Sequence, residues 1–373
     1  MAKSLAFWLE GNTSVDTSIE LHFNYWLLNM GSKQEIDYLD VGVKFKSLES
    51  LNSINIFFPF EIKTNNYIDN LGLTLSNNRE LIAAIFNARI DNLKTVSSNV
   101  FDICFVNNKK DKLRLFTQIE LSDKDANNGV SISNQDGGSI LSFPTTLIQL
   151  SEQESSTAGE VETAFGYFRF RIKLSSEDKK SISQIYVSKD AKFLSRIEST
   201  EIVDFRVNEV RNLPNKIVSK LNNNSCITSV HFFLIRETNS EHKLSHSEFK
   251  RCRLLEKNLW DSYLSVPPNI SIPEQMLIYH WKEPLQKQND KQYLENFSAF
   301  AKFCTITVTR WRLAGFICLG VILGMISGVF GNFVYSFFQP SNDANTNNPE
   351  HIRENIVSPP EHNSLKKKEI IDK

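Results

Sequence analysis

The segment YFRFRIKL, Tyr167 to Leu174, alternates apolar and charged residues with a period of two. In a β-strand, successive side chains point to opposite faces of the sheet. One face of this segment would therefore be apolar, formed by Phe168, Phe170, Ile172 and Leu174. The other face would carry the cations Arg169, Arg171 and Lys173. The pattern predicts a strand with one face in a core and the other in water.

The same alternation recurs in other parts of the chain, at 19–27, 41–46, 112–121 and 202–210. The segment Ser229–Ile235 is apolar on both faces except for His231, which suits a strand in the middle of a sheet. Helical spacing is less frequent and is clearest at Arg79–Ile90 and Ser245–Leu264. Strands dominate without a β-α-β rhythm. We therefore expect a mainly β protein with two antiparallel β-sandwich-like domains and a few helices.

A stretch of small and polar residues, SEQESSTAGEVET at 151–163, is the best candidate for a linker between domains. It would separate a β-rich domain at 1–150 from a second β-rich domain at 164–285. The second domain would contain a helix at 246–264, because a Ser and a Glu three residues apart are typical of a helix N-terminus.

Residues 313–338 form an apolar run without a charged side chain. At about 1.5 Å per residue, a helix of this length reaches about 39 Å, and the hydrocarbon core of a bilayer is about 30 Å thick. The run therefore predicts one transmembrane helix rather than a core helix. Residues 286–312 before it would form a juxtamembrane stalk. Residues 339–373 after it are polar and punctuated by proline, which predicts a disordered tail.

The ends of the apolar run carry residues that suit a membrane interface. Arg310, Trp311 and Arg312 precede the run, and Tyr335 lies near its other end. Basic residues are more frequent on the cytoplasmic side of membrane segments. Three lie in the twenty residues before the run and one in the twenty after it. We therefore expect a single-pass membrane protein with its N-terminal body in the cytoplasm.

The apolar run contains a glycine repeat that is typical of helix contacts in membranes. Gly320, Gly324 and Gly328 form two overlapping GxxxG motifs, and Gly331 and Ser327 fall on the same face, within a wedge of about 100°. Small residues let two helix backbones approach closely, so that dispersion contacts stabilise their association. The lipid bilayer is thus one expected partner, and a second copy of the chain is another.

The composition restricts the function classes. The chain has 373 residues and a formal net charge of −1, and the body up to Arg312 is formally neutral. A nucleic-acid-binding protein would show a basic excess, so we expect no broad surface of that kind. The five cysteines are scattered and odd in number, which indicates a reducing compartment. The short apolar stretch Leu5–Leu9 is interrupted by Glu10, so no secretory signal is expected.

The motifs of common catalytic and metal sites are weak. The sequence has no phosphate-binding glycine loop, no GxSxG and no HExxH. His242 and His246 lie four residues apart with Cys252 nearby, but a zinc site needs four converging ligands. We therefore expect neither a metal site nor a cofactor. The basic face of Arg169, Arg171 and Lys173 is the candidate for binding an anionic ligand.

One pattern suggests an enzyme instead. In SINIFFPFEIK, Glu61 and Lys63 would share one face of a strand, and Asp40 lies upstream. This E-x-K resembles the pattern of metal-dependent nucleases, in which carboxylates hold a divalent cation and a lysine steadies the reacting charge. The match covers only three residues.

The leading expectation is a non-enzymatic, membrane-anchored protein of the sensor, effector or scaffold type. Its β-rich body would bind an unidentified protein or small molecule, and its glycine-faced helix would self-associate. Two alternatives stay open. One is a membrane-anchored, metal-dependent nuclease-like enzyme that uses Glu61 and Lys63. The other is a receptor or adhesion ectodomain with the reverse membrane orientation.

Overall fold

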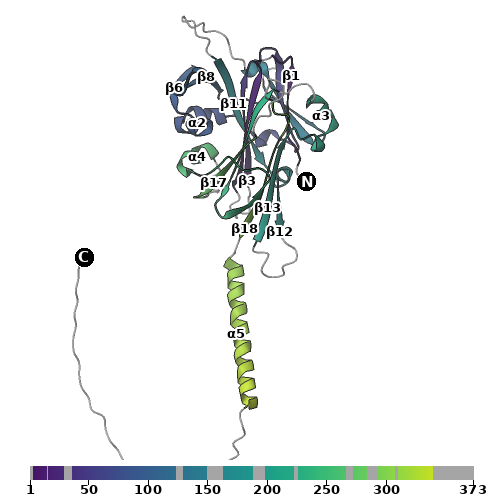
Figure 1. Cartoon of the computed structure of the whole chain (residues 1–373), viewed down its shortest axis with the longest axis vertical. Coiled ribbons are helices and arrows are strands. Elements are labelled where there is room, and N and C mark those ends of the chain that lie inside the picture. The colour runs from purple at the N-terminus through teal and green to yellow at the C-terminus, as the bar shows by residue number, and fades with distance from the viewer. Residues whose placement is uncertain are drawn as a thin grey trace, which may run out of the picture. The chain divides into compact units, whose positions relative to one another are not determined.

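The structure is a computed structural model of the chain (Figure 1). It describes residues 3–14, 16–28, 36–122, 129–148, 163–187, 198–221, 226–265, 272–283, 293–306 and 310–338. These residues are mainly in strands, with five α-helices. The chain divides into two compact units, Met1–Thr307 and Val308–Lys373. The expected fold class, a mainly β body with one C-terminal apolar helix, is confirmed.

A ten-stranded sheet forms the centre of the body. Its strands are, in spatial order, β16 (Arg251–Leu255), β17 (Met276–Lys282), β14 (Ile227–Glu237), β2 (Ser18–Leu28), β3 (Ile36–Lys46), β11 (Thr163–Leu174), β8 (Asn108–Phe116), β7 (Val100–Phe105) and β6 (Ile90–Ser97), with β5 (Tyr67–Ile68) paired to β11. The pairs β14–β2 and β11–β8 are parallel and the others antiparallel, so the sheet is mixed rather than purely antiparallel.

Two smaller sheets pack on one face of the large sheet. The first contains β1 (Ala6–Gly11), β4 (Leu51–Phe58), β10 (Gly138–Pro144) and β9 (Ser131–Gln135). The second contains β12 (Ser183–Val187), β13 (Glu198–Val207), β18 (Phe297–Ile306) and β15 (Ser240–Ser245). Stacked aromatic side chains fill the layer between them and the large sheet, with ring centroids 4.2 Å apart for Phe205 and Phe232. The apolar faces that the alternation predicted meet in this layer.

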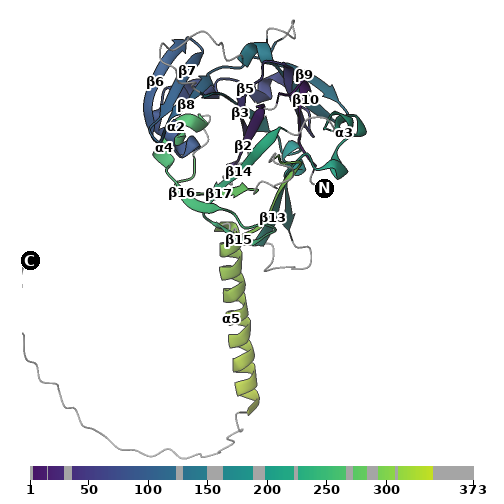
Figure 2. The same ribbon diagram turned by 45° about the horizontal axis from the view of Figure 1, so that its top comes forward.

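Helices cover the opposite face of the large sheet. They are α1 (Leu71–Ser76), α2 (Arg79–Phe86) and α4 (Lys257–Leu264). Figure 2 shows α2 and α4 close together beside the sheet, whereas α3 (Asn215–Leu221) lies against β1 of a smaller sheet. The N-terminus of α2 is capped by Asn78, whose side chain accepts hydrogen bonds from the backbone N–H groups of Glu80 and Leu81.

The body does not divide at the expected linker. β2 and β3 from the first predicted domain pair with β14 and β11 from the second, so both halves of the chain share one sheet. The physical reason is that β2, buried along most of its length, needs a partner strand on each side, and one of them comes from beyond residue 226. Residues 151–162 of that linker lie outside the described residues.

Two smaller expectations about the body are also wrong. The helix predicted at 246–264 begins only at Lys257, because the residues before it form β16 on the edge of the large sheet. The stalk predicted at 286–312 contains the strand β18, which pairs with β13 on one side and β15 on the other. Alternate burial of Phe297, Ala299 and Ala301 explains the strand, since these side chains enter the core together.

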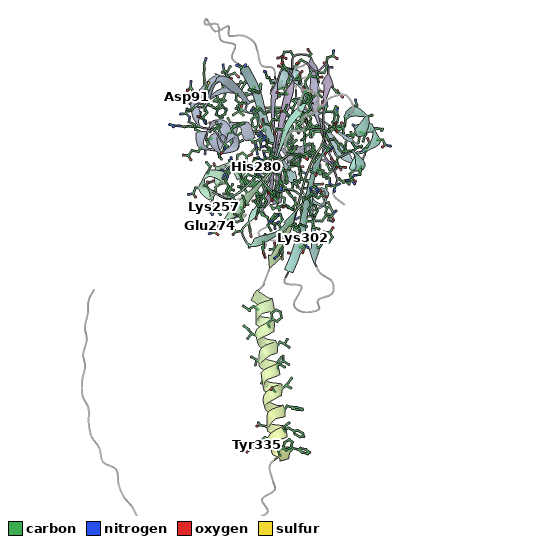
Figure 3. The ribbon with its side chains drawn as sticks, viewed as in Figure 1. Asp91, Lys257, Glu274, His280, Lys302 and Tyr335 are labelled. Carbon is green, nitrogen blue, oxygen red and sulfur yellow. The ribbon has the colours of Figure 1, made fainter. Side chains whose placement is uncertain are left out.

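The second unit contains the helix α5 (Arg310–Phe338). Its residues Leu313–Phe338 have a mean hydropathy of 2.4, so it is long and apolar enough to cross a membrane. Tyr335 is exposed near its C-terminal end (Figure 3). Arg310, Trp311 and Arg312 form the first turn, and their side chains lie outside the described part of the chain. The tail predicted at 339–373 also lies outside it.

Candidate functional site

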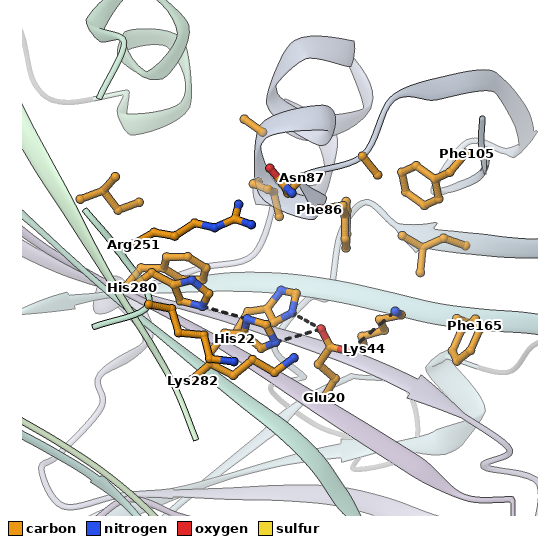
Figure 4. A pocket seen from close by; sticks show the side chains of 18 of the residues that line it. Glu20, His22, Lys44, Phe86, Asn87, Phe105, Phe165, Arg251, His280 and Lys282 are labelled. Carbon is orange, nitrogen blue, oxygen red and sulfur yellow. Dashed lines mark hydrogen bonds and ion pairs between the residues drawn. The ribbon is translucent and has the colours of Figure 1, made fainter. Parts of the chain in front are cut away.

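A pocket of about 520 Å³ lies on the face of the large sheet that the helices cover (Figure 4). It extends across eight strands, from β16 to β7, and the C-terminal end of α2 closes it on one side. The alternation of each strand selects which residues face the pocket, because every second side chain points to this face. A pocket of this volume is in the range of those that hold small-molecule ligands.

The pocket is strongly cationic. Its cations are Lys44, Lys112, Lys250, Arg251, Arg253 and Lys282. Two of them are paired with carboxylates: Lys112 lies 2.8 Å from Asp102, and Lys44 lies 3.8 Å from Glu20, the only acidic residue among those that line the pocket. The other four have no ion pair with a described carboxylate. Positive charge is therefore available to an anionic ligand.

Aromatic rings form part of the wall. They belong to Phe86, Phe105, Phe165 and Phe233. The rings of Phe86 and Phe105 lie 5.8 Å apart, and the ring of His280 stacks on Phe233 at 4.3 Å. The ammonium group of Lys44 lies over the ring of Phe165, 4.7 Å from its centroid. Flat aromatic walls beside cations suit a ligand that has both a flat ring and a negative charge.

A series of polar contacts crosses the pocket floor from β2 to β17 (Figure 4). Glu20 Oε1 lies 2.8 Å from Nε2 of His22 and 3.5 Å from Nε2 of His231. Nδ1 of His231 lies 3.0 Å from Nε2 of His280. The strand register explains the cluster, because Glu20 and His22 are two residues apart on β2 and His231 is directly opposite His22 on β14.

The three histidines of the pocket floor, His22, His231 and His280, are neutral at pH 7 because their pKa values are lowered. Burial lowers the pKa of His231 to about 2, aided by the neighbouring His22, and burial lowers the pKa of His280 to about 4. Burial likewise lowers the pKa of His22. For Glu20, burial acts to raise the pKa, but the hydrogen bond with His22 and nearby positive charge outweigh it and lower the pKa. The positive charge of the pocket thus comes from its lysines and arginines.

Neither a known protein family nor a curated protein matches this chain. The pocket is accordingly the feature from which a function can be argued.

The basic face predicted on β11 is not an exposed surface. Arg169 and Arg171 are buried, and Arg171 is paired with Asp40 through Nε at 2.5 Å and Nη2 at 3.1 Å. Arg169 donates to the hydroxyl groups of Tyr167 and Tyr263. The helix α4 covers this face and supplies Tyr263, so the charged side of the strand meets protein instead of water. Lys173 alone of the three is exposed.

This buried network supports the pocket floor. Gly42 of β3 lies between His22 and Arg169 in the sheet register. A Cβ atom at Gly42 would overlap the hydroxyl group of Tyr167. Glycine at this position therefore lets Tyr167 reach Arg169, while the Tyr167 ring packs edge-on against Phe86 at 4.8 Å.

The other sequence candidates are not brought together. Glu61 and Lys63 follow the end of β4 and are exposed, so the E-x-K is not borne on a strand. Asp40, the upstream acidic residue of the E-x-K pattern, is buried and forms an ion pair with Arg171. His242 packs between the rings of Phe249 and Phe303 rather than toward a shared metal position.

Sequence reasoning missed most of the pocket. His231, which the sequence shows only as the polar residue of an apolar strand, bonds to His280 and lines the pocket. The missed signal was the polar side of the segment 19–27, where Glu20, His22 and Asn24 alternate with apolar residues. Alternating polar residues of this kind are typical of a sheet face exposed to water. This face forms a pocket only because helices cover it.

Proposed function

We propose that the protein is a membrane-anchored receptor for an anionic small molecule, which binds in the pocket of the β-rich body. The observation that carries the proposal is the group of four cations without a described carboxylate partner, next to aromatic walls in a concave site. The alternative explanation is that these cations lie on an open sheet face and are only solvated. Lys250, Arg251 and Arg253 are exposed and Lys282 is half-buried, so the support for the receptor is that all four line one concave site together with the aromatic rings.

The ligand class follows from the pocket lining. Cations without partners favour phosphate or carboxylate groups, and flat rings favour an aromatic base. Nucleotides combine both parts, and a mononucleotide fits a pocket of about 520 Å³. We therefore propose a nucleotide as the ligand, with its phosphates toward Arg251 and Lys282 and its base among the phenylalanines.

ATP is the probe for this proposal. The full chain in detergent micelles should bind ATP more tightly than either inorganic triphosphate or adenosine, since each of these offers only one half of the interactions. Isothermal titration calorimetry measures the three dissociation constants. Equal affinity for ATP and triphosphate would show that the base does not contribute to binding. If no anion binds, the proposal of a receptor is wrong.

Removing pocket cations should weaken ATP binding. A charge-assisted hydrogen bond contributes about 1.5 kcal/mol or more, which is about tenfold in Kd. Arg251→Gln combined with Lys282→Gln should therefore weaken ATP binding about 100-fold in the same calorimetric titration. Lys173→Gln is the matched control, because Lys173 is an exposed cation of the same sheet that does not line the pocket. An equal loss in the control would contradict a site in the pocket.

We also propose that α5 crosses the membrane and associates with a second copy through its glycine face. Gly320, Gly324 and Gly328 have no neighbouring atoms where a Cβ would lie, and bulky residues there would separate two backbones. Gly324→Leu combined with Gly328→Leu should abolish association, measured by energy transfer between labelled chains in lipid vesicles. Gly315→Leu, on the other side of the helix, should leave it unchanged. Wild-type association in the double variant would refute this role.

The body is proposed to face the cytoplasm, on the basis of the basic residues before α5. Ligand binding there would change the packing of the helices and so signal across the bilayer. Sealed vesicles with a known orientation test the side of the body. Protease added outside right-side-out vesicles should leave the body intact, and its digestion would favour the ectodomain alternative.

A further inference from the structure

The floor of the pocket brings three metal-ligating groups together. The donor atoms of Glu20, His22 and His231 all lie within 4.8 Å of one another. The arrangement is built into the sheet, because Glu20 and His22 share one face of β2 and β14 places His231 beside His22. Rigid strands hold the three side chains in register, which is what a metal site requires.

The hydrogen bonds of His231 orient it as a ligand. Its Nδ1 bonds to His280, whereas its buried Nε2 has no hydrogen-bond partner among the described residues and points to Glu20. When Nδ1 carries the proton, Nε2 keeps a lone pair and faces a carboxylate oxygen 3.5 Å away. Two electron-rich atoms repel at this distance unless a cation lies between them. Histidine ligands commonly donate their second N–H in this way.

We propose that Glu20, His22 and His231 bind one first-row divalent transition-metal ion, with zinc as the first candidate. Two imidazole nitrogens and one carboxylate are a ligand set that zinc takes, and three protein ligands leave a fourth position open. That position faces the pocket. The alternative is a histidine network held by hydrogen bonds alone, and the unpartnered Nε2 of His231 favours the metal.

The charge around the site gives the proposal a second consequence. Lys44 lies 3.8 Å from Glu20, and the other pocket cations also repel a divalent ion. An anion in the pocket would offset this repulsion and supply the fourth ligand. Metal and anion should therefore each strengthen the binding of the other, by the same factor in both directions.

Cobalt(II) titration tests the metal site without reference to any nucleotide. The full chain in detergent, stripped with a chelator, should bind one Co²⁺ per chain with the visible absorption of a site of low coordination number, and Zn²⁺ should displace it. His231→Gln should weaken Co²⁺ binding more than 100-fold, since loss of a partner of a ligand already costs about 10- to 100-fold. His280→Gln, which removes only the partner of a ligand, should weaken Co²⁺ binding by about 10- to 100-fold.

A matched control and a second variant make the result decisive. His246→Gln removes an exposed histidine outside the pocket and should leave Co²⁺ binding unchanged. His22 is buried and its replacement can unfold the body, so Glu20→Gln, at a half-exposed position, is the second ligand variant. Zn²⁺ should raise the unfolding temperature of the wild type but not that of His231→Gln. No Co²⁺ bound to the wild type, or equal affinity in His231→Gln, overturns the proposal.

Discussion

Asp40→Asn is expected to destabilise the body by about 3–5 kcal/mol, the usual loss when one partner of a buried ion pair is removed. Asp40 is completely buried and accepts hydrogen bonds from Arg171, Trp26 and Tyr263. Asparagine has nearly the same shape but no charge, so two buried guanidinium groups would lose their counterion. Guanidinium denaturation followed by tryptophan fluorescence measures the loss.

The control for Asp40 is an acidic residue whose ion pair is exposed. Glu177 lies 2.6 Å from Lys180, and both side chains are in water. Glu177→Gln should change stability by no more than about 1 kcal/mol, because exposed pairs contribute little. A loss below about 1 kcal/mol for Asp40→Asn as well would show that the network does not depend on its charge.

Lowering the pH should remove the contribution of Asp40 to the stability of the wild-type fold. Burial acts to raise the pKa of Asp40, but the positive charge of Arg171 and its hydrogen bonds outweigh burial and hold the pKa below its ordinary value. A carboxyl group with a lowered pKa in the folded state stabilises the fold above its unfolded pKa, and this contribution is lost as the pH falls. Asp40→Asn should therefore lose less stability than the wild type between neutral and acid pH.

Ending the chain at residue 307 is expected to release the body from membranes. The apolar residues of α5 each favour the bilayer interior by about 0.3–0.6 kcal/mol for the Leu, Ile, Phe and Val side chains, and together they make insertion effectively irreversible. The body forms a compact unit with its own core, so it should stay soluble without the helix. Ultracentrifugation of cell lysates separates the two outcomes.

The matched control for this truncation ends at residue 338, which removes the tail and keeps α5. It should sediment with membranes as the full chain does. If the chain ending at 307 also sediments, the body binds membranes by itself and α5 is not the anchor.

Period-two alternation predicted some of the strands in the described residues, among them β2, β3, β11 and β13, but not the majority. Phe168, Phe170 and Ile172 on β11 face the core as the pattern requires, because an apolar face of a sheet has to be covered. The same pattern failed for the charged side of that strand. Arg169 and Arg171 look identical in sequence whether they face water or a covering helix, and the residue that decides the matter, Tyr263, lies more than ninety residues away.

The pocket could not be predicted for a related reason. Its parts come from strands whose pairing depends on long-range register, such as β2 with β14. Alternation gives the face of a residue within one strand, but not the neighbour of that strand. The sequence therefore shows Glu20, His22 and His231 as separate polar residues, and only the parallel pairing of their strands places them side by side.

The order of strand pairing has a consequence for synthesis. β2 cannot gain its partner β14 until more than two hundred further residues have left the ribosome, and the last strand of the body, β18, ends at Ile306. Only residues 307–309 then separate it from α5. The nascent chain thus presents its unpaired β2 edge for most of translation, and such edges invite aggregation. Chaperones that shield strand edges should therefore be needed until β14 emerges.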